Sequence, residues 1–193
     1  MIFDGKTDAA LGVYYRLFET EERALISSRT DREGRGRVRI IDLWIENDLG
    51  DRVDTLITGK PAIFKLLIKS EEKSVIRSLN AGIAIFTMGS MFVASLSTQE
   101  GGGYSFDMEN PEVLVTFRID RLTLNNGQFY LNAVVRSAIG AYEFDDLVEN
   151  AKEFLVDYGD FHGIGQSSGG FMSLAHQVSV KPYSTVDSGA PLP

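Results

Sequence analysis

The feature that most constrains this chain is a repeated alternation of apolar and polar residues with a period of two. It is clearest over residues 62–69, and it recurs over 113–120, 129–136 and 171–180. Successive side chains of a strand point to opposite faces, so this alternation predicts four strands that each bury one face. Further strands are expected at 40–46, 79–87, 91–97 and 154–158.

Clusters of Gly, Asn, Ser and Pro separate these segments. They occur at 47–50, 59–61, 101–103, 125–127 and 167–170. About eight short strands with turns between them predict an all-β chain, folded as an antiparallel sandwich or barrel. Two segments depart from this pattern. An apolar stripe through 8–28 predicts one amphipathic helix, and residues 144–151 are compatible with one or two helical turns.

The strand expected at 40–46 contains the single tryptophan of the chain. Its inward residues are expected to be Ile40, Leu43 and Ile45, with a bulge-like phase slip that turns Trp44 outward. An outward ring can cover the apolar C–H face of a sugar, because the ring is flat, rigid and partly solvated. Packing at an edge or an interface explains such a ring equally well.

Charge and composition exclude several classes of function. The chain has 193 residues, 27 acidic and 19 basic, with a net charge of −8, which argues against broad binding to nucleic-acid backbones. It contains no cysteine, so thiolate zinc sites, iron–sulfur clusters and cysteine nucleophiles are excluded. No apolar run approaches the roughly 20 residues that span a bilayer. We expect a soluble, cytoplasmic protein without a cofactor.

Few residues offer catalytic or metal chemistry. Asp157, Asp160 and His162 lie close together in the sequence, and His176 is the only other histidine. These residue types serve as acid–base groups and metal ligands, but nothing completes a constellation. Residues 165–169 match the Gly-x-Ser-x-Gly spelling of a hydrolase elbow, although the helix that such an elbow requires does not follow. No catalytic and no metal-binding residues are expected.

Outward side chains of a sandwich can line up into a binding surface. Arg118 and Arg136 are expected to point outward, where a guanidinium can clamp a carboxylate or a phosphate. A solvated sheet face or a cross-strand pair is the commoner explanation of both arginines. The outward positions suited to sugar recognition are Trp44, Asn80, Arg118, Tyr130, Asn132, Arg136, His176 and Gln177. They cannot all share one face, because the strands divide between two sheets.

Several short segments, taken in order, carry a family resemblance. Val38–Asn47 followed by Gly50 looks like an opening strand and turn, and Leu79–Ile85 looks like a middle strand. The other segments are Thr58–Pro61, Phe64–Leu66, Phe117–Leu124, Gly127–Leu131, Tyr142–Asp146, Phe154–Val156 and the glycine-rich loop. Over residues 36–181 the chain resembles the Wzt C-terminal domain, the carbohydrate-binding module fused to the ATPase subunit of O-antigen polysaccharide ABC transporters.

The resemblance implies an immunoglobulin-like antiparallel β-sandwich over residues 36–181. Residues 1–35 look like the end of an ABC nucleotide-binding domain, a helix followed by a linker, and residues 182–193 are expected to be a flexible tail. The implied activity is binding without catalysis. The domain would recognise the capped, non-reducing end of lipid-linked O-antigen polysaccharide and couple it to export.

The resemblance also implies partners and a location. The partners are the polysaccharide terminus, a second copy of the chain that exchanges the last strand (about 171–181), and the membrane subunit and ATPase domain of the transporter. The location is cytoplasmic, at the inner face of the inner membrane. The resemblance supplies no motif for the site, so the expected carbohydrate-binding residues come from the outward positions above: Trp44, Arg118, Tyr130, Asn132, Arg136, His176 and Gln177. His176 stands near a position where the family often has a tryptophan.

Two other functions are compatible with the sequence. One is a β-sandwich module that binds a partner protein through an open sheet edge. The other is a small β-sandwich hydrolase that uses Asp157, Asp160 and His162, or Ser167.

Overall fold

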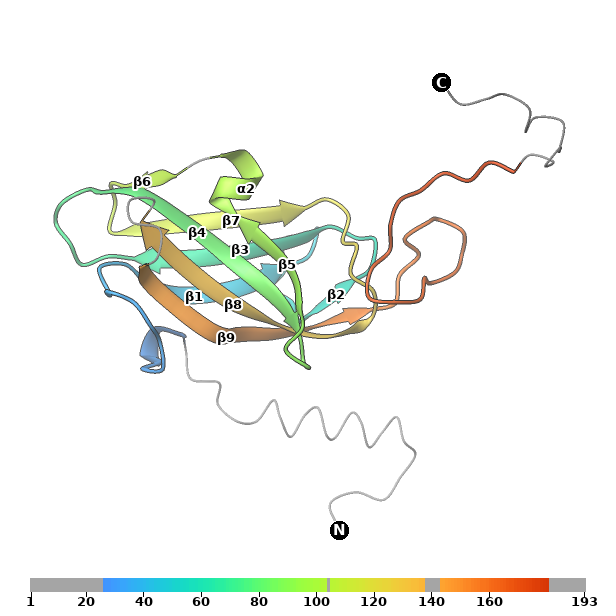
Figure 1. Cartoon of the computed structure of the whole chain (residues 1–193), viewed down its shortest axis with the longest axis horizontal. Helices are drawn as coiled ribbons and strands as arrows, with labels where there is room; N and C mark the ends of the chain where they lie inside the picture. The colour runs from blue at the N-terminus through green and yellow to red at the C-terminus, as the bar shows by residue number, and fades with distance from the viewer. Residues whose placement is uncertain (1–25, 104, 138–142, 181–193) are drawn as a thin grey trace, which may run out of the picture.

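The computed structural model describes residues 26–103, 105–137 and 143–180. In these ranges the chain forms two β-sheets that pack face to face (Figure 1). The predicted all-β sandwich is therefore confirmed. The elements are η1 (Ile26–Ser28), β1 (Arg39–Glu46), β2 (Thr55–Ile57), β3 (Ala62–Lys69), β4 (Ile76–Thr87), β5 (Phe92–Ser97), α2 (Thr98–Gly102), β6 (Phe106–Met108), β7 (Glu112–Ile119), β8 (Gly127–Ser137) and β9 (Phe144–Asp157).

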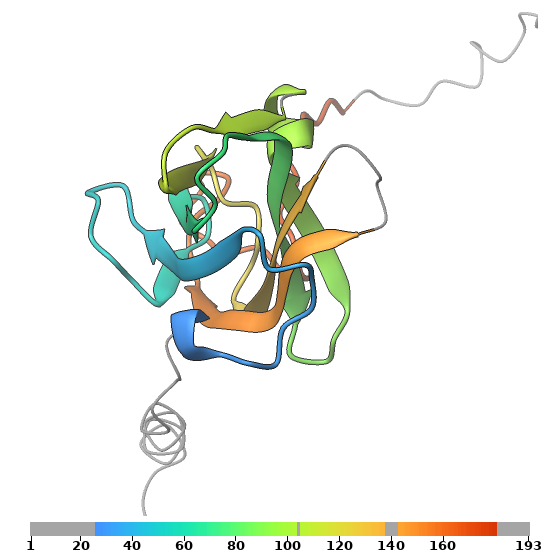
Figure 2. The ribbon, with the colours of Figure 1, turned by 90° about the vertical axis from the view of Figure 1, so that its left-hand side faces the viewer.

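The smaller sheet has the strand order β1-β3-β7, and the larger sheet has the order β2-β9-β8-β4-β5, with β6 paired to the beginning of β4. All these pairs are antiparallel except that of β2 with β9. Figure 2 looks roughly along the strands and shows the two layers around the core. Among the strands that the structure describes, β5 and β7 each end their sheet and so present an open edge.

The inward residues of the alternating segments meet between the sheets. Phe64 of β3 packs edge-on against Phe154 of β9, with ring centroids 5.9 Å apart, and Phe154 stacks on Phe129 of β8 at 5.6 Å. All three side chains are at most 2% exposed. Burying one such ring contributes roughly 1.5–3 kcal/mol, so this aromatic cluster holds the two layers together.

Strand β1 carries the phase slip that the sequence predicts. Ile40, Leu43 and Ile45 are buried, and the register with β3 shifts between Ile40 and Asp42. A bulge adds one residue to a strand and moves the following side chains to the other face. Trp44 consequently points to the outer face of the smaller sheet, where it is half-buried.

The prediction of helical turns over residues 144–151 is wrong, because these residues belong to β9 and pair with β8. The strand is not apparent from the sequence, because Asp145 and Asp146 occupy buried positions where the alternation would require apolar residues. Their charges are compensated from the segment before β1. Arg37 Nε donates to Asp145 at 2.8 Å, and Arg32 Nη1 donates to Asp146 at 3.1 Å.

The strand predicted over residues 171–180 does not form within the described chain. Only an isolated bridge joins Met172 to Leu124, and no ladder follows it. A strand needs a neighbour for its backbone groups, and the described part of the chain offers none to residues 174–180. The segment leaves the sandwich (Figure 1, red), and its apolar side chains face solvent, with Val180 90% exposed.

Three smaller differences remain. The sequence pattern misses β2 and β6, because a strand of three residues has no alternation to detect. The helix predicted over 8–28 lies outside the described residues except for 26–28, which form the 3-10 turn η1, and the predicted tail over 182–193 lies outside them entirely. Within the described ranges, no helix is long and apolar enough to cross a membrane.

Candidate functional site

The outer face of the larger sheet carries side chains from three neighbouring strands. Every second residue of β4 from Asn80 to Phe86 alternates with buried neighbours and therefore points away from the core. In the register, Ala84 lies beside Ser95 of β5 and Asn132 of β8. Cross-strand neighbours have Cβ atoms about 5 Å apart, so these side chains form one continuous surface.

Small residues leave a depression in this surface, which we call the sheet hollow. Gly82, Ala84 and Val134 line its floor, and its volume is about 240 Å³. A Cβ atom on Gly82 would lie 3.1 Å from the carbonyl oxygen of Leu96 and 3.3 Å from Ser97 Cβ, so any larger residue would crowd β5. The rim is polar and consists of Asn80, Ser95, Ser97, Gln99, Glu100 and Arg136.

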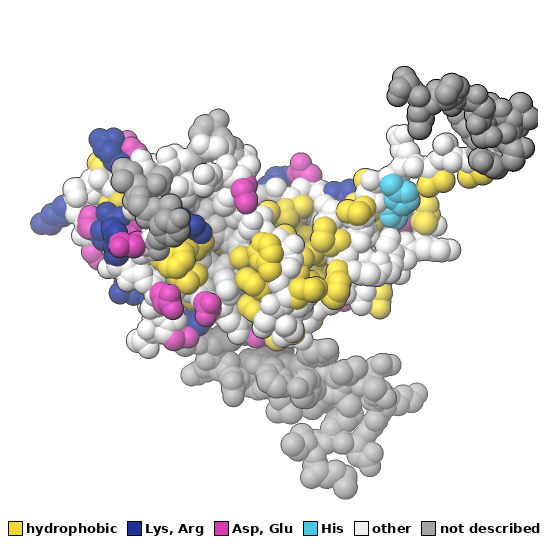
Figure 3. All heavy atoms as spheres, viewed as in Figure 1, with side chains coloured by type: hydrophobic (Ala, Val, Ile, Leu, Met, Phe, Trp, Pro, Cys, Tyr) yellow, Lys and Arg dark blue, Asp and Glu magenta, His cyan; other side chains and the backbone are white. Residues whose placement is uncertain are grey.

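An aromatic row, formed by Phe92, Phe86 and Tyr130, crosses the same face. Phe86 stacks on Tyr130 with ring centroids 5.3 Å apart and an interplanar angle of 10°, and it meets Phe92 edge-on at 5.6 Å. Figure 3 shows apolar side chains gathered over β5, β4 and β8 on this face. Flat, partly solvated rings beside polar groups suit stacking against the C–H face of a sugar.

Two charged residues on the rim differ in what they already bind. Ser95 Oγ lies 3.0 and 3.1 Å from the two carboxylate oxygens of Glu100 in α2 and donates to this carboxylate. The backbone N–H of Glu100 donates to the Ser97 hydroxyl, which caps α2. Arg136 lies over the ring of Phe144, 5.7 Å from its centroid, and forms no ion pair with any described residue. The rim therefore offers a fixed acceptor and an uncommitted cationic donor.

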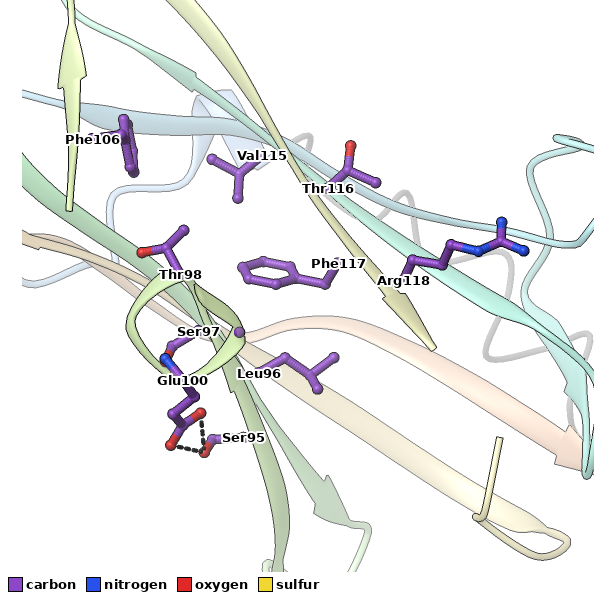
Figure 4. A pocket seen from close by; sticks show the side chains of 11 residues that line it. Ser95, Leu96, Ser97, Thr98, Glu100, Phe106, Val115, Thr116, Phe117 and Arg118 are labelled. Atoms are coloured by element: carbon purple, nitrogen blue, oxygen red, sulfur yellow. Dashed lines mark hydrogen bonds between the residues drawn. The ribbon is translucent and has the colours of Figure 1, made fainter. Parts of the chain in front are cut away.

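A larger cavity, which we call the edge cleft, opens where the sheets separate between β5 and β7 (Figure 4). Its volume is about 540 Å³. Leu96, Phe106, Val115 and Phe117 supply its apolar walls from β5, β6 and β7, and α2 lies beside it.

Strand β8 brings together three of the predicted carbohydrate-binding residues. Tyr130, Asn132 and Arg136 all point to the outer face of the larger sheet, because they share one phase of the alternation. Asn132 Oδ1 also accepts from the backbone N–H of Asn150 at 2.8 Å, where the register of β9 shifts. Tyr130 belongs to the aromatic row and Arg136 to the rim of the sheet hollow.

Trp44 and Arg118 lie on the other side of the sandwich, on the outer face of the smaller sheet. Trp44 Nε1 donates to Glu46 at 2.7 Å, and the guanidinium of Arg52 covers its ring at 4.1 Å from the centroid. Arg118 Nε donates to Asp120 at 2.7 Å. The structure gives both predicted residues local partners and separates them from the sheet hollow.

A charge network holds Trp44 in this position. Glu46 is nearly buried and accepts from Lys65 Nζ at 2.8 Å as well as from Trp44. Hydrogen bonds from Lys65 and then Trp44 lower the pKa of Glu46, because they stabilise its ionised form. The indole N–H of Trp44, the carboxylate of Glu46 and the ammonium of Lys65 therefore already have partners within this network.

His176 and Gln177 belong to the C-terminal segment, and neither borders the sheet hollow or the edge cleft. The ring of His176 meets that of His162 edge-on, with centroids 5.2 Å apart. The only two histidines of the chain are therefore in contact. The structure does not join them to the residues on β8.

The carboxylate of Asp160 forms hydrogen bonds within its own loop. Its carboxylate accepts from the backbone N–H groups of Gly165 at 2.6 Å and Ile164 at 2.9 Å, and these bonds lower the pKa of Asp160. In the described part of the chain, no group of three or more His, Asp or Glu side chains could hold a metal ion. Residues 165–169 lead into no helix, as predicted for a loop.

The sequence reasoning missed Phe86, Phe92, Gly82, Ala84 and Glu100. For four of them a signal was present: in the segments 79–87 and 91–97, two aromatics and two small residues occupy outward positions. Glu100 offers no such signal, since it lies on a helix of five residues.

Comparisons with known proteins agree with the architecture. A family model described as the Wzt C-terminal domain matches residues 29–167. A crystal structure of the C-terminal domain of Wzt is similar with a TM-score of 0.64 and 16% identity, covering 79% of this chain and 90% of that chain. An alkylpurine DNA glycosylase of Pseudomonas fluorescens bound to DNA is less similar, with a TM-score of 0.40 and 11% identity over 63% of this chain and 30% of that chain. No curated protein matches the sequence.

Proposed function

This chain belongs to the Wzt C-terminal domain family, which comprises carbohydrate-binding domains of O-antigen ABC transporters, and we propose that its sheet hollow binds the capped, non-reducing end of lipid-linked O-antigen polysaccharide. Occupancy of the hollow would couple the finished glycan to export. The domain acts by binding, and the chemistry of transport belongs to the transporter.

The observation that carries this proposal is the placement of the aromatic row beside the polar-rimmed hollow on one sheet. Phe86 and Tyr130 offer a stacked platform, while Asn80 and Gln99 offer amides that can both donate to and accept from sugar hydroxyls. Strands hold these groups at a fixed spacing, so little freedom is lost when a ligand binds.

An anionic cap would be held by Arg136. The sequence offers Arg118 as the other candidate, but its guanidinium is paired with Asp120 on the smaller sheet. Arg136 borders the sheet hollow and has no ion-pair partner in the described ranges. A guanidinium can bind a carboxylate or phosphate through two parallel hydrogen bonds, which adds specificity to affinity.

The segment before β1 supports a link between this site and a preceding domain. Arg32 and Arg37 fasten it to the beginning of β9. In the proposal, residues 1–35 are the end of an ABC nucleotide-binding domain with its linker, residues 36–181 are the carbohydrate-binding domain, and residues 182–193 are a tail. The partners are the ATPase domain and membrane subunit of the transporter, at the cytoplasmic face of the inner membrane.

The C-terminal segment supports a dimer with exchanged strands. Residues 171–180 alternate like a strand but have no ladder in the described chain, and Leu174 and Val178 are exposed. A sheet edge of a second copy would supply hydrogen-bond partners and cover these side chains. Light scattering that finds only monomers at micromolar concentration would contradict this part of the proposal.

Titration calorimetry with capped and uncapped O-polysaccharide tests the proposed function. We expect tighter binding of the capped form, and a loss of about tenfold or more on Tyr130→Ala, which is about 1.4 kcal/mol. Leu114→Ala is the matched control, since Leu114 is exposed on the outer face of the smaller sheet. Equal and negligible binding of both polysaccharides would refute the proposal.

A further inference from the structure

The edge cleft is not used by the proposed saccharide site. Leu96, Phe106, Val115 and Phe117 pack against the core but remain partly exposed, because no strand of the described residues closes the sandwich between β5 and β7. Small-molecule sites typically have volumes of roughly 300–1,000 Å³ and mostly apolar walls. The cleft, at about 540 Å³, meets both criteria.

The edge cleft and the sheet hollow are separated only by β5 and the first turn of α2. Ser95, Leu96, Ser97 and Glu100 line both cavities. Figure 4 shows the Glu100 carboxylate bonded to Ser95 near the apolar side chains of the cleft. A substituent on a ligand in the hollow therefore has to pass only this rim to enter the cleft.

The charges at the margin of the cleft are already partnered. Glu100 accepts from Ser95, and Arg118 pairs with Asp120 and points away from the apolar walls in Figure 4. Hydroxyl groups placed against such walls would lose their hydration without gaining a hydrogen bond. An alkyl chain has no such cost, and each methylene that leaves water strengthens binding by about fourfold.

From this continuity we propose that the edge cleft binds the hydrocarbon chain of an acyl or alkyl substituent carried by the saccharide in the sheet hollow. This inference rests on the proposed function, because the saccharide places the chain beside β5. It adds a second determinant of specificity: a glycan end that bears an apolar group of several carbons is preferred over the same end without one.

The test is a titration of the chain with methyl, butyl, hexyl and octyl glucosides and mannosides, octyl below its micelle concentration, followed by NMR. We expect affinity to rise at least about tenfold from methyl to hexyl, within the ceiling set by burying five methylenes. The methyl signals of Leu96 and Val115 should shift only with the longer chains. The backbone amide signal of Val134, which lines the floor of the hollow, should shift with every glycoside.

Val115→Trp should fill the cleft and remove the dependence on chain length, whereas Leu114→Trp, its outward neighbour on β7, should retain it. The NMR shifts of Leu96 and Val115 in the wild-type chain test the inference even if one of the two variants fails to fold. An affinity independent of chain length, or octanol binding as tightly as octyl glycosides, would overturn the inference. Shifts of Val115 that depend on protein concentration alone would also overturn it, since a second copy would then fill the cleft.

The two proposals fail in different ways. If capped polysaccharide still binds and Tyr130→Ala still weakens it, but no glycoside shifts Val115, the cleft inference is wrong and the proposed function stands. If neither polysaccharide binds, the proposed function is wrong regardless of how affinity depends on alkyl chain length. The combined site for a saccharide and its alkyl substituent is then also rejected.

Discussion

The guanidinium of Arg32 and the carboxylate of Asp146 lie 3.1 Å apart with side chains only 5% and 3% exposed. Asp146 also accepts from the backbone N–H of Ile40 at 2.7 Å, and Arg32 also donates to the carbonyl of Ile26 at 2.7 Å. Burial raises the pKa of Asp146, opposed by the Ile40 bond and the charge of Arg32. This pair fixes η1 and the following segment against β1 and β9.

Arg32→Ala should destabilise the domain by about 3–5 kcal/mol, because it leaves the Asp146 carboxylate buried without its partner. The measurement is urea unfolding at neutral pH. Arg77→Ala is the matched control, since the Arg77–Asp107 pair is exposed and such pairs contribute about 0–1 kcal/mol. Similar losses in the two variants would show that the Arg32 pair does not secure the segment.

The loop that follows β9 should lose stability in acid because of Asp160. Backbone N–H groups lower the pKa of Asp160 below its usual 3.8. The folded state therefore binds this proton less readily than the unfolded chain, and the stabilisation is present above the unfolded pKa and lost as pH falls through the folded pKa. Asp160→Asn should be less stable than wild type at pH 7, and the difference should shrink below about pH 4. A difference that stays constant down to about pH 2 would contradict this assignment.

The long strands were predictable because each buries one face and exposes the other, as in 62–69 and 129–136. The first half of β9 was not, because its buried positions hold Asp145 and Asp146, whose partners lie more than 100 residues away in the sequence. The segment 171–180 shows the converse case: the alternation is present, but the described part of the chain supplies no neighbouring strand.

The candidate site was predictable only along a strand, not across strands. The period of two places Tyr130, Asn132 and Arg136 on one face of β8 without further information. That β4 lies beside β8, and so brings Phe86 and Ala84 to the same surface, depends on long-range pairing. Local sequence does not determine which strands pair, so the sheet hollow could not be predicted from it.

Filling the sheet hollow should remove glycan binding with little effect on the fold. Ala84→Phe places a ring between Ser95 and Asn132, on an outer face where strands tolerate aromatic residues. We expect at least a tenfold loss of affinity for capped polysaccharide and a change in stability within about 1 kcal/mol. Leu114→Phe, on the other outer face, should bind normally. Unchanged affinity of Ala84→Phe in calorimetry would place the glycan elsewhere.

Recognition of an anionic cap should depend on Arg136 and not on Arg118. Arg136→Ala should weaken binding of a glycan with a carboxylate or phosphate cap by about tenfold or more, since a charge-assisted pair contributes about 1.5–3 kcal/mol. Arg136→Lys should recover only part, because an ammonium cannot form the two parallel bonds. Arg118→Ala should bind like wild type. The assignment is wrong if Arg136→Ala retains full affinity, or if its loss is the same for the uncapped glycan.

The single tryptophan provides a check on which face binds the glycan. Trp44 lies on the outer face of the smaller sheet, covered by Arg52 and bonded to Glu46, whereas the hollow lies on the larger sheet. Saturating polysaccharide should therefore leave the wavelength and intensity of Trp44 emission unchanged, while calorimetry on the same sample reports binding. Arg52→Ala should uncover the ring and shift its emission to the red, which shows that the probe responds to its surroundings. A quench or shift of Trp44 emission by polysaccharide in the wild-type chain would move the site to the smaller sheet and away from the aromatic row.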